Sequence, residues 1–510
     1  MLILKEYRGH IRNWKALCDE LGISETAGRS SREEQILLKG YAKWGVKLPD
    51  HIYGMFALAI WDEEEKQLYC VRDQFGTKPF YYYQAADGSL LYGTNISRIL
   101  EQPGFVKKLN EKMLQIYLTM TYVAGEETFF DGIKKLMPGH YLLWKDGRFE
   151  VTRYWQPTYH PDEDKSLEDW ADEIHNTLKH IMTEVKEPDE TAESFLSGGV
   201  DSSYVLAMSD AMMTDTCGYE EARFDESPLA AETASILGRG INRCIVQPED
   251  FFATVPYTME KMEQPLADAS AIVFTIGCNA TARHTKLCYS GEGSDEFFGG
   301  YNMYRNAERY GDNLENFYVG NTNIMKEEEK QQILKNYDPS VLPIGLTKEI
   351  YAASKGLDPL TRMADIDIQL WLEGDIYLNV DKMSTAAGLE IRMPLTDLRM
   401  FDIASRIPAK FKVNDEQNKV AFRTAAAKVL PEEVAFRKKL GFIVPIRIWM
   451  ADDRYNQDVR AKFAGASAEK FFHVDAIRAI FDEYVSGNSD LWRKVWTIYT
   501  FLVWYDIYFA

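Results

Sequence analysis

Two glycine-rich stretches carry hydroxyl and carboxylate groups at a spacing suited to a phosphorylated ligand. The first reads Leu196-Ser-Gly-Gly-Val-Asp-Ser-Ser203. Residues 193–196 are typical of a buried strand and residues from Tyr204 onward of a helix, which predicts a tight turn between them. Glycines let backbone N–H groups approach a phosphate, and a helix N-terminus attracts its charge. The candidate ligand-binding residues here are Leu196, Ser197, Gly198, Gly199, Asp201, Ser202 and Ser203.

The second stretch, Ser290–Tyr301, contains four glycines and three carboxylates, and Ser290 and Gly291 begin it as further ligand-binding candidates. Asp201 would repel a bare phosphate, so its presence predicts a bridging Mg²⁺, which Asp295 would share. Glu292 is a candidate general base. A solvated acidic loop is the simpler interpretation, but the phenylalanines at 297 and 298 predict that the segment returns to a core.

The segment that carries both stretches alternates between predicted strands and helices, which indicates a doubly wound parallel sheet. The expected strands are 193–196, 217–219, 244–246 and 286–289, and the expected helices are 174–185 and 228–238. Each glycine-rich stretch follows a strand. Because ligands bind beyond the carboxyl ends of such strands, both stretches should face one crevice. Residues after about 305 are predicted to be mainly helical.

The first part of the chain has a different pattern. Short predicted strands at 54–62, 67–72, 80–83 and 141–144 surround one amphipathic helix at 31–45, which favours a layered α+β domain. A polar segment rich in Asp, Glu, Pro and His follows it. We therefore predict an N-terminal domain at 1–157, a linker at 158–168 and a second domain at 169–510.

Composition narrows the class of protein. A net charge of −20 argues against a nucleic-acid or anionic-membrane surface. No apolar run reaches the roughly 20 residues of a membrane span, and the first residues lack the pattern of a signal peptide. Six cysteines without CxxC spacing disfavour a structural zinc site and fit a reducing, cytoplasmic location.

The first stretch lacks the Gly-Lys-Ser/Thr of a Walker loop and resembles the pyrophosphate loop of ATP-pyrophosphatases. Together the two stretches resemble the synthetase half of class B asparagine synthetases. The resemblance continues in order along nearly the whole chain, at 263–270, 380–384, 389–397, 419–423 and 437–445.

The resemblance implies ATP and Mg²⁺ as cofactors. A small-molecule carboxylate attacks the α-phosphate, pyrophosphate leaves, and ammonia or an amine then displaces AMP to give an amide. Asp201 and Asp295 match the metal-binding positions, Lys439 the lysine that stabilises charge, and Glu292 the position that assists amine deprotonation. Relatives that close β-lactam rings have tyrosine at that last position, so glutamate disfavours ring closure. Lys382, Arg392 and Arg423 are weaker candidates, with a structural ion pair as the alternative for each.

The N-terminal part departs from the family. The chain begins Met1-Leu-Ile-Leu instead of Met-Cys-Gly-Ile, whose cysteine attacks glutamine, and residues 7–13 replace Asn-Gly-Glu-Ile-Tyr-Asn. Arg32 occupies the position at which the family has an acidic residue that binds substrate. Cys18 lies in a predicted helix interior and is interpreted as a core residue. We expect a degenerate remnant of an Ntn-type glutaminase sandwich that lacks its first third to half, or one completed by an upstream segment or a separate chain. An uncovered sheet edge or apolar face would then favour a partner that supplies ammonia, or a homo-oligomer.

Three functions remain open from the sequence. The leading one is an amide synthetase without its own glutaminase, with aspartate as the default acceptor. The second is a tailoring amide ligase that acts on another carboxylate and amine. The third, a non-catalytic ATP-binding subunit, is disfavoured because Asp201, Glu292, Asp295 and Lys439 are all present.

Overall fold

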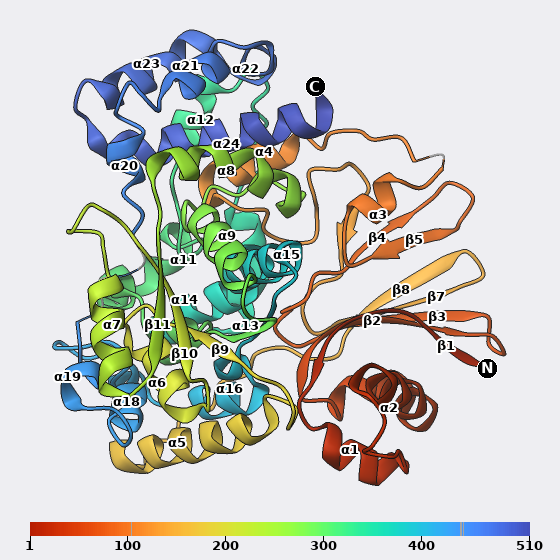
Figure 1. Ribbon diagram of the computed structural model, residues 1–510. Coiled ribbons are helices and arrows are strands. Elements are labelled where there is room, and N and C mark those ends of the chain that lie inside the picture. The colour runs from red at the N-terminus through yellow and green to blue at the C-terminus, as the bar shows by residue number, and fades with distance from the viewer. Residues whose placement is uncertain (104, 439–440, 442) are drawn as a thin grey trace.

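The computed structural model describes residues 1–103, 105–438, 441 and 443–510. Its N-terminal part contains two antiparallel sheets, a five-stranded one in the order β1-β2-β3-β7-β8 and a three-stranded one in the order β5-β4-β6 (Figure 1). The strands are β1 (Leu2–Ile11), β2 (Gly54–Asp62), β3 (Gln67–Arg72), β4 (Tyr81–Gln84), β5 (Leu90–Gly93), β6 (Lys134–Lys135), β7 (His140–Lys145) and β8 (Arg148–Arg153).

The central strand β2 shows why these layers form. Phe56, Leu58 and Ile60 pack in one cluster with α1 (Trp14–Leu21) and α2 (Arg29–Trp44), whereas Ala57 and Ala59 face the three-stranded sheet. Bulky and small side chains alternate because successive residues of a strand point to opposite faces. Both faces of β2 are therefore buried.

Of the two alternatives expected from the sequence, an uncovered sheet edge or an uncovered apolar face, the described residues show open edges and a covered face. Among the described residues of this N-terminal part, Met1 and Val106 are the exposed large apolar side chains. The helix layer and the second sheet cover the two faces of the five-stranded sheet. Its two edge strands are β1, which pairs with β2, and β8, which pairs with β7. The helices α3 (Ser97–Leu100) and α4 (Lys112–Met120) complete this part.

A second five-stranded sheet follows, and its described pairings are all parallel, in the order β11-β10-β9-β12-β13. The predicted α/β, doubly wound architecture is confirmed. The direction of winding reverses between β9 and β12, so the crevice of this fold lies beyond the carboxyl ends of those two strands. The strands are β9 (Glu193–Phe195), β10 (Met213–Gly218), β11 (Gly240–Ile245), β12 (Leu287–Tyr289) and β13 (Glu390–Arg392).

Two helices begin earlier than the sequence pattern predicts. The helix expected at 174–185 is α5 (Leu167–Glu184), because Ser166 and Asp169 form a capping box that starts it. The helix expected from Tyr204 is α6 (Val200–Met208), so Asp201, Ser202 and Ser203 lie in its first turn. The other helices around the sheet are α7 (Ser227–Ile236), α8 (Pro248–Met262), α9 (Ser270–Thr281) and α10 (Ser294–Phe298).

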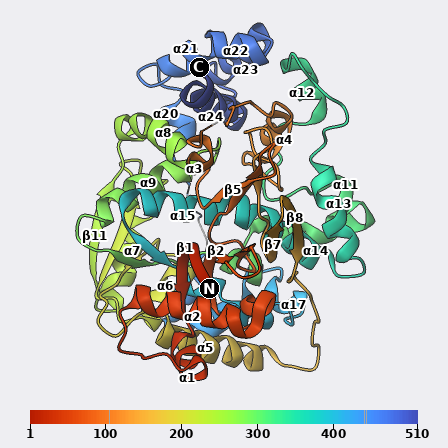
Figure 2. The same cartoon turned by 90° about the vertical axis from the view of Figure 1, so that its right-hand side faces the viewer.

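The rest of the chain is mainly helical, as predicted, and in both views α20–α24 gather at one end of the molecule (Figures 1 and 2). The α-helices are α11 (Leu314–Phe317), α12 (Glu327–Ile333), α13 (Ile344–Ala353), α14 (Pro359–Ile366), α15 (Tyr377–Ala387), α16 (Leu398–Ala404), α17 (Ala409–Lys412), α18 (Val420–Ala426), α19 (Glu432–Ala435), α20 (Ile446–Trp449), α21 (Gln457–Phe463), α22 (Ala466–Phe471), α23 (Val474–Val485) and α24 (Trp492–Phe509). The 3-10 segments are Gly45–Asp50, Asn302–Asn313, Pro394–Thr396 and Ser489–Leu491, and a π-helical segment, Asp367–Ile376, precedes α15.

Within the described residues, none of the helices has the length and apolar character needed to cross a bilayer.

Candidate active site

The two glycine-rich stretches meet at the point where the sheet reverses direction. The first follows β9 and the second follows β12. A Cβ atom added at Gly291 would lie 2.8 Å from the backbone nitrogen of Ser202 and 2.9 Å from the carbonyl carbon of Asp201. The second stretch therefore packs directly on the first turn of α6, and only a residue without a side chain fits there.

The turn before α6 is held by its own serines. Gly198 has φ +80°, a conformation that favours glycine. The Ser197 hydroxyl accepts a hydrogen bond from the Gly199 N–H at 3.3 Å and lies 3.1 Å from the Ser202 hydroxyl. Ser203 is fully buried, and its hydroxyl donates to the Gly199 carbonyl at 2.7 Å. Ser203 thus shapes the turn, and the first N–H groups of α6 are left without partners inside the helix.

Lys419 connects the two predicted metal-binding carboxylates. Its Nζ lies 2.6 Å from Asp201 Oδ1 and 2.8 Å from Asp295 Oδ1, and it also donates to the Ser294 hydroxyl at 2.8 Å. The lysine side chain is almost fully buried, whereas those of Asp201 and Asp295 are 19% and 20% exposed. One buried ammonium therefore holds together two carboxylates that remain accessible to a ligand.

The Lys419–Asp295 contact also explains why residue 300 is a glycine. A Cβ atom at Gly300 would lie 1.7 Å from Asp295 Oδ1 and 2.2 Å from Lys419 Cε. These are impossible distances, so a larger residue at 300 would displace the ion pair. The backbone at Gly300 therefore packs directly against the side chains of Lys419 and Asp295.

The carboxylates of the second stretch differ in their surroundings. Glu292 is partly buried and accepts a hydrogen bond from the Ser290 hydroxyl at 3.2 Å. Glu296 is 2% exposed, and burial together with the neighbouring Asp295 charge raises its pKa to about 8, even though the Tyr301 hydroxyl donates to it. The stretch is therefore built into the core rather than being a solvated acidic loop.

Lys439 lies outside the described residues, but the chain that leads to it is anchored beside the first stretch. Arg437 Nη1 donates to the Gly198 carbonyl at 3.0 Å and to Thr233 Oγ1 at 3.0 Å. Arg423 holds the same segment, since its Nη1 donates to the carbonyls of Ala435 and Arg437 at 2.7 and 3.0 Å.

The two other weaker candidates form ion pairs. Lys382 Nζ contacts Glu263 Oε2 at 2.5 Å, and Arg392 contacts Glu190 at 2.6 Å and Glu390 at 2.8 Å. Both side chains are almost completely buried. These contacts match the structural alternative given for both residues.

Sequence reasoning missed Lys419 as a site residue. Charge balance is the signal that could have identified Lys419, because two carboxylates expected in one crevice need a cation. The neighbouring motif at 419–423 contained both a lysine and an arginine, and nothing in the pattern distinguished them. The fold makes the choice, since Lys419 enters between the carboxylates and Arg423 points to backbone carbonyls.

A cavity of about 640 Å³ lies elsewhere, between the end of the N-terminal part and α13. Trp155, Tyr159, Arg153, Leu346 and Asp365 are among its lining residues. It contains none of the predicted site residues.

Comparison with known proteins supplies the class. Residues 173–506 match the asparagine synthase family, and residues 3–155 match the glutamine amidotransferase domain. Asparagine synthetase (glutamine-hydrolyzing) 1 of Bacillus subtilis is 30% identical over 98% of this chain and 85% of its own length. Asparagine synthetase (glutamine-hydrolyzing) 3 of the same organism is 26% identical over 85% of this chain and 74% of its own length. Amidase chry2 of Gibberella zeae is 30% identical over 53% of this chain and 43% of its own length.

The fold, the paired loops and these matches define an amide-forming ligase. The chain belongs to the asparagine synthase family and carries a domain of the glutamine amidotransferase type before its synthetase domain.

Proposed function

We propose that this protein is an ATP- and Mg²⁺-dependent amide synthetase that adenylates a small carboxylic acid, with aspartate as the default acceptor, and transfers ammonia or an amine to it. We also propose that it has no glutaminase activity of its own. The proposed domain limits remain 1–157, 158–168 and 169–510. They are supported by the family matches at 3–155 and 173–506.

The observation that carries the proposal is the contact of Lys419 with Asp201 and Asp295 at the reversal point of the sheet. The N-terminus of α6 and the Gly198–Gly199 turn lie beside these charges and suit a polyphosphate. The carboxylates suit Mg²⁺, because this ion takes oxygen ligands and is commonly held by one or two carboxylates plus substrate phosphates. Bound there, Mg²⁺ would neutralise charge on the departing pyrophosphate.

In the proposed reaction an oxygen of the substrate carboxylate bonds to the α-phosphorus of ATP, and the bond to the β-phosphate oxygen breaks. Pyrophosphate leaves, and an acyl-adenylate remains. The lone pair of the amine nitrogen then attacks the acyl carbon, and AMP leaves with the former carboxylate oxygen. Glu292 is proposed to take the proton that the nitrogen loses. Lys439 is proposed to stabilise negative charge in both steps, which is supported by the anchoring of Arg437 at Gly198.

The proposal that glutamine is not the nitrogen source rests on what the N-terminal side chains do instead. Arg32, at the position of a substrate-binding acid, is buried, forms an ion pair with Glu187 and stacks on Trp14 at 3.7 Å. His10, at the position of a family glutamate, is 1% exposed, and burial lowers its pKa to about 4.

The one cysteine near the start of the chain offers no activated thiol in place of the missing nucleophile. Cys18 is 1% exposed, packs in the core between α1, α2 and the sheet, and burial raises its pKa. A cysteine becomes a good nucleophile when its pKa is lowered, so Cys18 has the properties of a core residue. A cytoplasmic location, a partner chain and a homo-oligomer stay predictions.

A tailoring ligase is the second candidate, and the match to a fungal amidase over half of the chain favours testing it. The experiment measures pyrophosphate release from Mg-ATP with aspartate and with other carboxylic acids, each with ammonium or with glutamine. Release with aspartate and ammonium but not glutamine supports the proposal. Equal rates with glutamine would refute the absence of a glutaminase, and release with another acid alone would favour the tailoring ligase. An Asp201→Asn variant controls for contaminating ATPases.

A further inference from the structure

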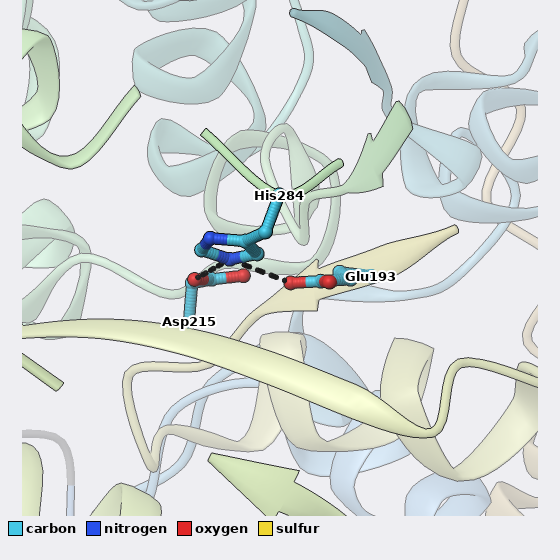
Figure 3. A group of neighbouring side chains, drawn as sticks. All are labelled: Glu193, Asp215 and His284. Carbon is cyan, nitrogen blue, oxygen red and sulfur yellow. Dashed lines mark hydrogen bonds and ion pairs between the residues drawn. The ribbon is translucent and has the colours of Figure 1, made fainter. Parts of the chain in front are cut away.

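A second cluster of potential metal ligands lies on the parallel sheet, away from the candidate active site. His284 Nε2 is 3.1 Å from Glu193 Oε2 and 3.0 Å from Asp215 Oδ1, and the three side chains converge in Figure 3. Glu193 is the first residue of β9, whereas the glycine-rich turn follows the last residue of that strand. Ser197 is four residue steps along the chain from Glu193, which corresponds to roughly 13 Å in an extended segment.

The fold brings these groups together from distant parts of the sequence. Strands β9 and β10 are neighbours in register, with Thr214 opposite Ser194, so Glu193 and Asp215 fall on the same face of the sheet. Asn242 of β11 is directly opposite Asp215, and its side-chain amide lies 3.0 Å from His284 Nε2. His284 comes from the turn between α9 and β12.

Two carboxylates buried this close together are unfavourable when both carry a negative charge. Glu193 and Asp215 are 9% and 6% exposed. Asp215 Oδ2 is buried and has no hydrogen-bond partner among the described residues, and Glu193 Oε2 makes no hydrogen bond of good geometry there. Burial and the adjacent Asp215 raise the pKa of Glu193 to about 7, which reflects how unfavourable a second negative charge is at this place.

We propose that Glu193, Asp215 and His284 bind one divalent transition-metal ion of the Zn²⁺ type, with Asn242 as a candidate fourth ligand. Two ligand atoms that are each about 2.1 Å from one ion lie roughly 3.0–3.4 Å apart, which agrees with the separations between His284 Nε2 and the carboxylates. Imidazole together with carboxylates suits Zn²⁺, whereas Mg²⁺ prefers oxygen ligands alone. Two carboxylates balance the charge of the ion.

The proposed site has an entrance and a structural role. The His284 side chain is 38% exposed, so an ion can reach the cluster from solvent, while the carboxylates stay covered. An ion held by β9, β10 and the turn after α9 would tie these three elements together. It would stabilise the fold and take no part in the chemistry of ATP.

The test uses the full chain, stripped of metal with a chelator. Calorimetric titration with Zn²⁺ in the absence of ATP and Mg²⁺ is expected to give one saturable site and to raise the melting temperature. Asp215→Asn and His284→Gln should each weaken Zn²⁺ binding at least tenfold. Loss of a residue that only hydrogen-bonds to a metal ligand already lowers metal affinity 10- to 100-fold. His180→Gln is the matched control, because His180 lies 3.5 Å from Glu184 on the exposed face of α5.

Three results would overturn the proposal. The first is no saturable Zn²⁺ binding to the wild-type chain, in which case His284 is simply an ion-pair partner of the two carboxylates. The second is equal affinity in wild type and His284→Gln. The third is a cobalt–thiolate absorption band after loading with Co²⁺, which would mean that cysteines bind the ion. Cys217 of β10 and Cys244 of β11 are directly opposite each other and could do so. Cys244→Ser would remove that band and identify the thiols as the true ligands.

Discussion

Replacing Lys419 with methionine tests the arrangement of the candidate active site most directly. Methionine keeps the length and burial of the side chain but removes the charge that Asp201 and Asp295 share. Removing one partner of a buried ion pair costs about 3–5 kcal/mol, because the remaining charges stay in place without compensation. With roughly 2 °C for each kcal/mol in a domain of this size, the melting temperature should fall by about 6–10 °C.

The assay is thermal unfolding of wild type, Lys419→Met and Lys428→Met, each with and without Mg²⁺ and in the absence of ATP. Lys428 pairs with Glu168 and Asp172, both of which are largely exposed, so its loss should cost no more than about 1 kcal/mol. Mg²⁺ should stabilise Lys419→Met more than wild type, because only the variant leaves the two carboxylates without a cation.

One outcome would refute this reasoning. If Lys419→Met melted within a degree of Lys428→Met and responded to Mg²⁺ as wild type does, the ammonium would not be holding the carboxylates together in solution. A loss of pyrophosphate release in such a variant would then have to come from contact of Lys419 with ATP itself.

Three further predictions concern the same site. Asp201→Asn should lower pyrophosphate release by about 100-fold or more, as loss of one charge-stabilising group does, while Lys419 still pairs with Asp295 and the circular dichroism spectrum stays unchanged. Gly300→Ala should destabilise the protein by about 1–3 kcal/mol in urea unfolding and reduce activity, whereas Gly345→Ala, where the added Cβ meets no atom within 4 Å, should do neither. Glu296 has a raised pKa of about 8, so its contribution to stability is complete below its unfolded pKa of about 4.3 and is lost as the pH rises through 8. The melting temperature of Glu296→Gln should therefore depend less on pH between 5 and 8 than that of wild type, and identical profiles would contradict the assignment.

The parallel sheet and its two glycine-rich loops can be predicted from the sequence, because glycines at strand ends and helical periodicity are local signals. The sequence was insufficient for β13, a three-residue strand whose pairing with β12 depends on a segment about 100 residues away. The sequence pattern predicts the start of α6 four residues too late, since glycine and aspartate are weak helix formers and their role as a helix N-terminus depends on the turn before them. Lys419 was missed for a related reason, because only the fold selects which cation enters between the two carboxylates.

Ion pairs between arginines and carboxylates join the N-terminal domain to the synthetase domain. Arg12 forms a buried ion pair with Asp397 at 2.5 Å, and Arg29 forms a partly exposed one with Glu390 at 2.7 Å, so both arginines contact the synthetase domain. Although burial opposes it, Arg399 and Arg12 together lower the pKa of Asp397 to about 2. An arginine is costly to bury unless it is paired, and removing either domain would leave these charges without partners. We therefore expect a chain shortened to the synthetase domain to be less stable than the full chain, whether or not the N-terminal domain hydrolyses glutamine.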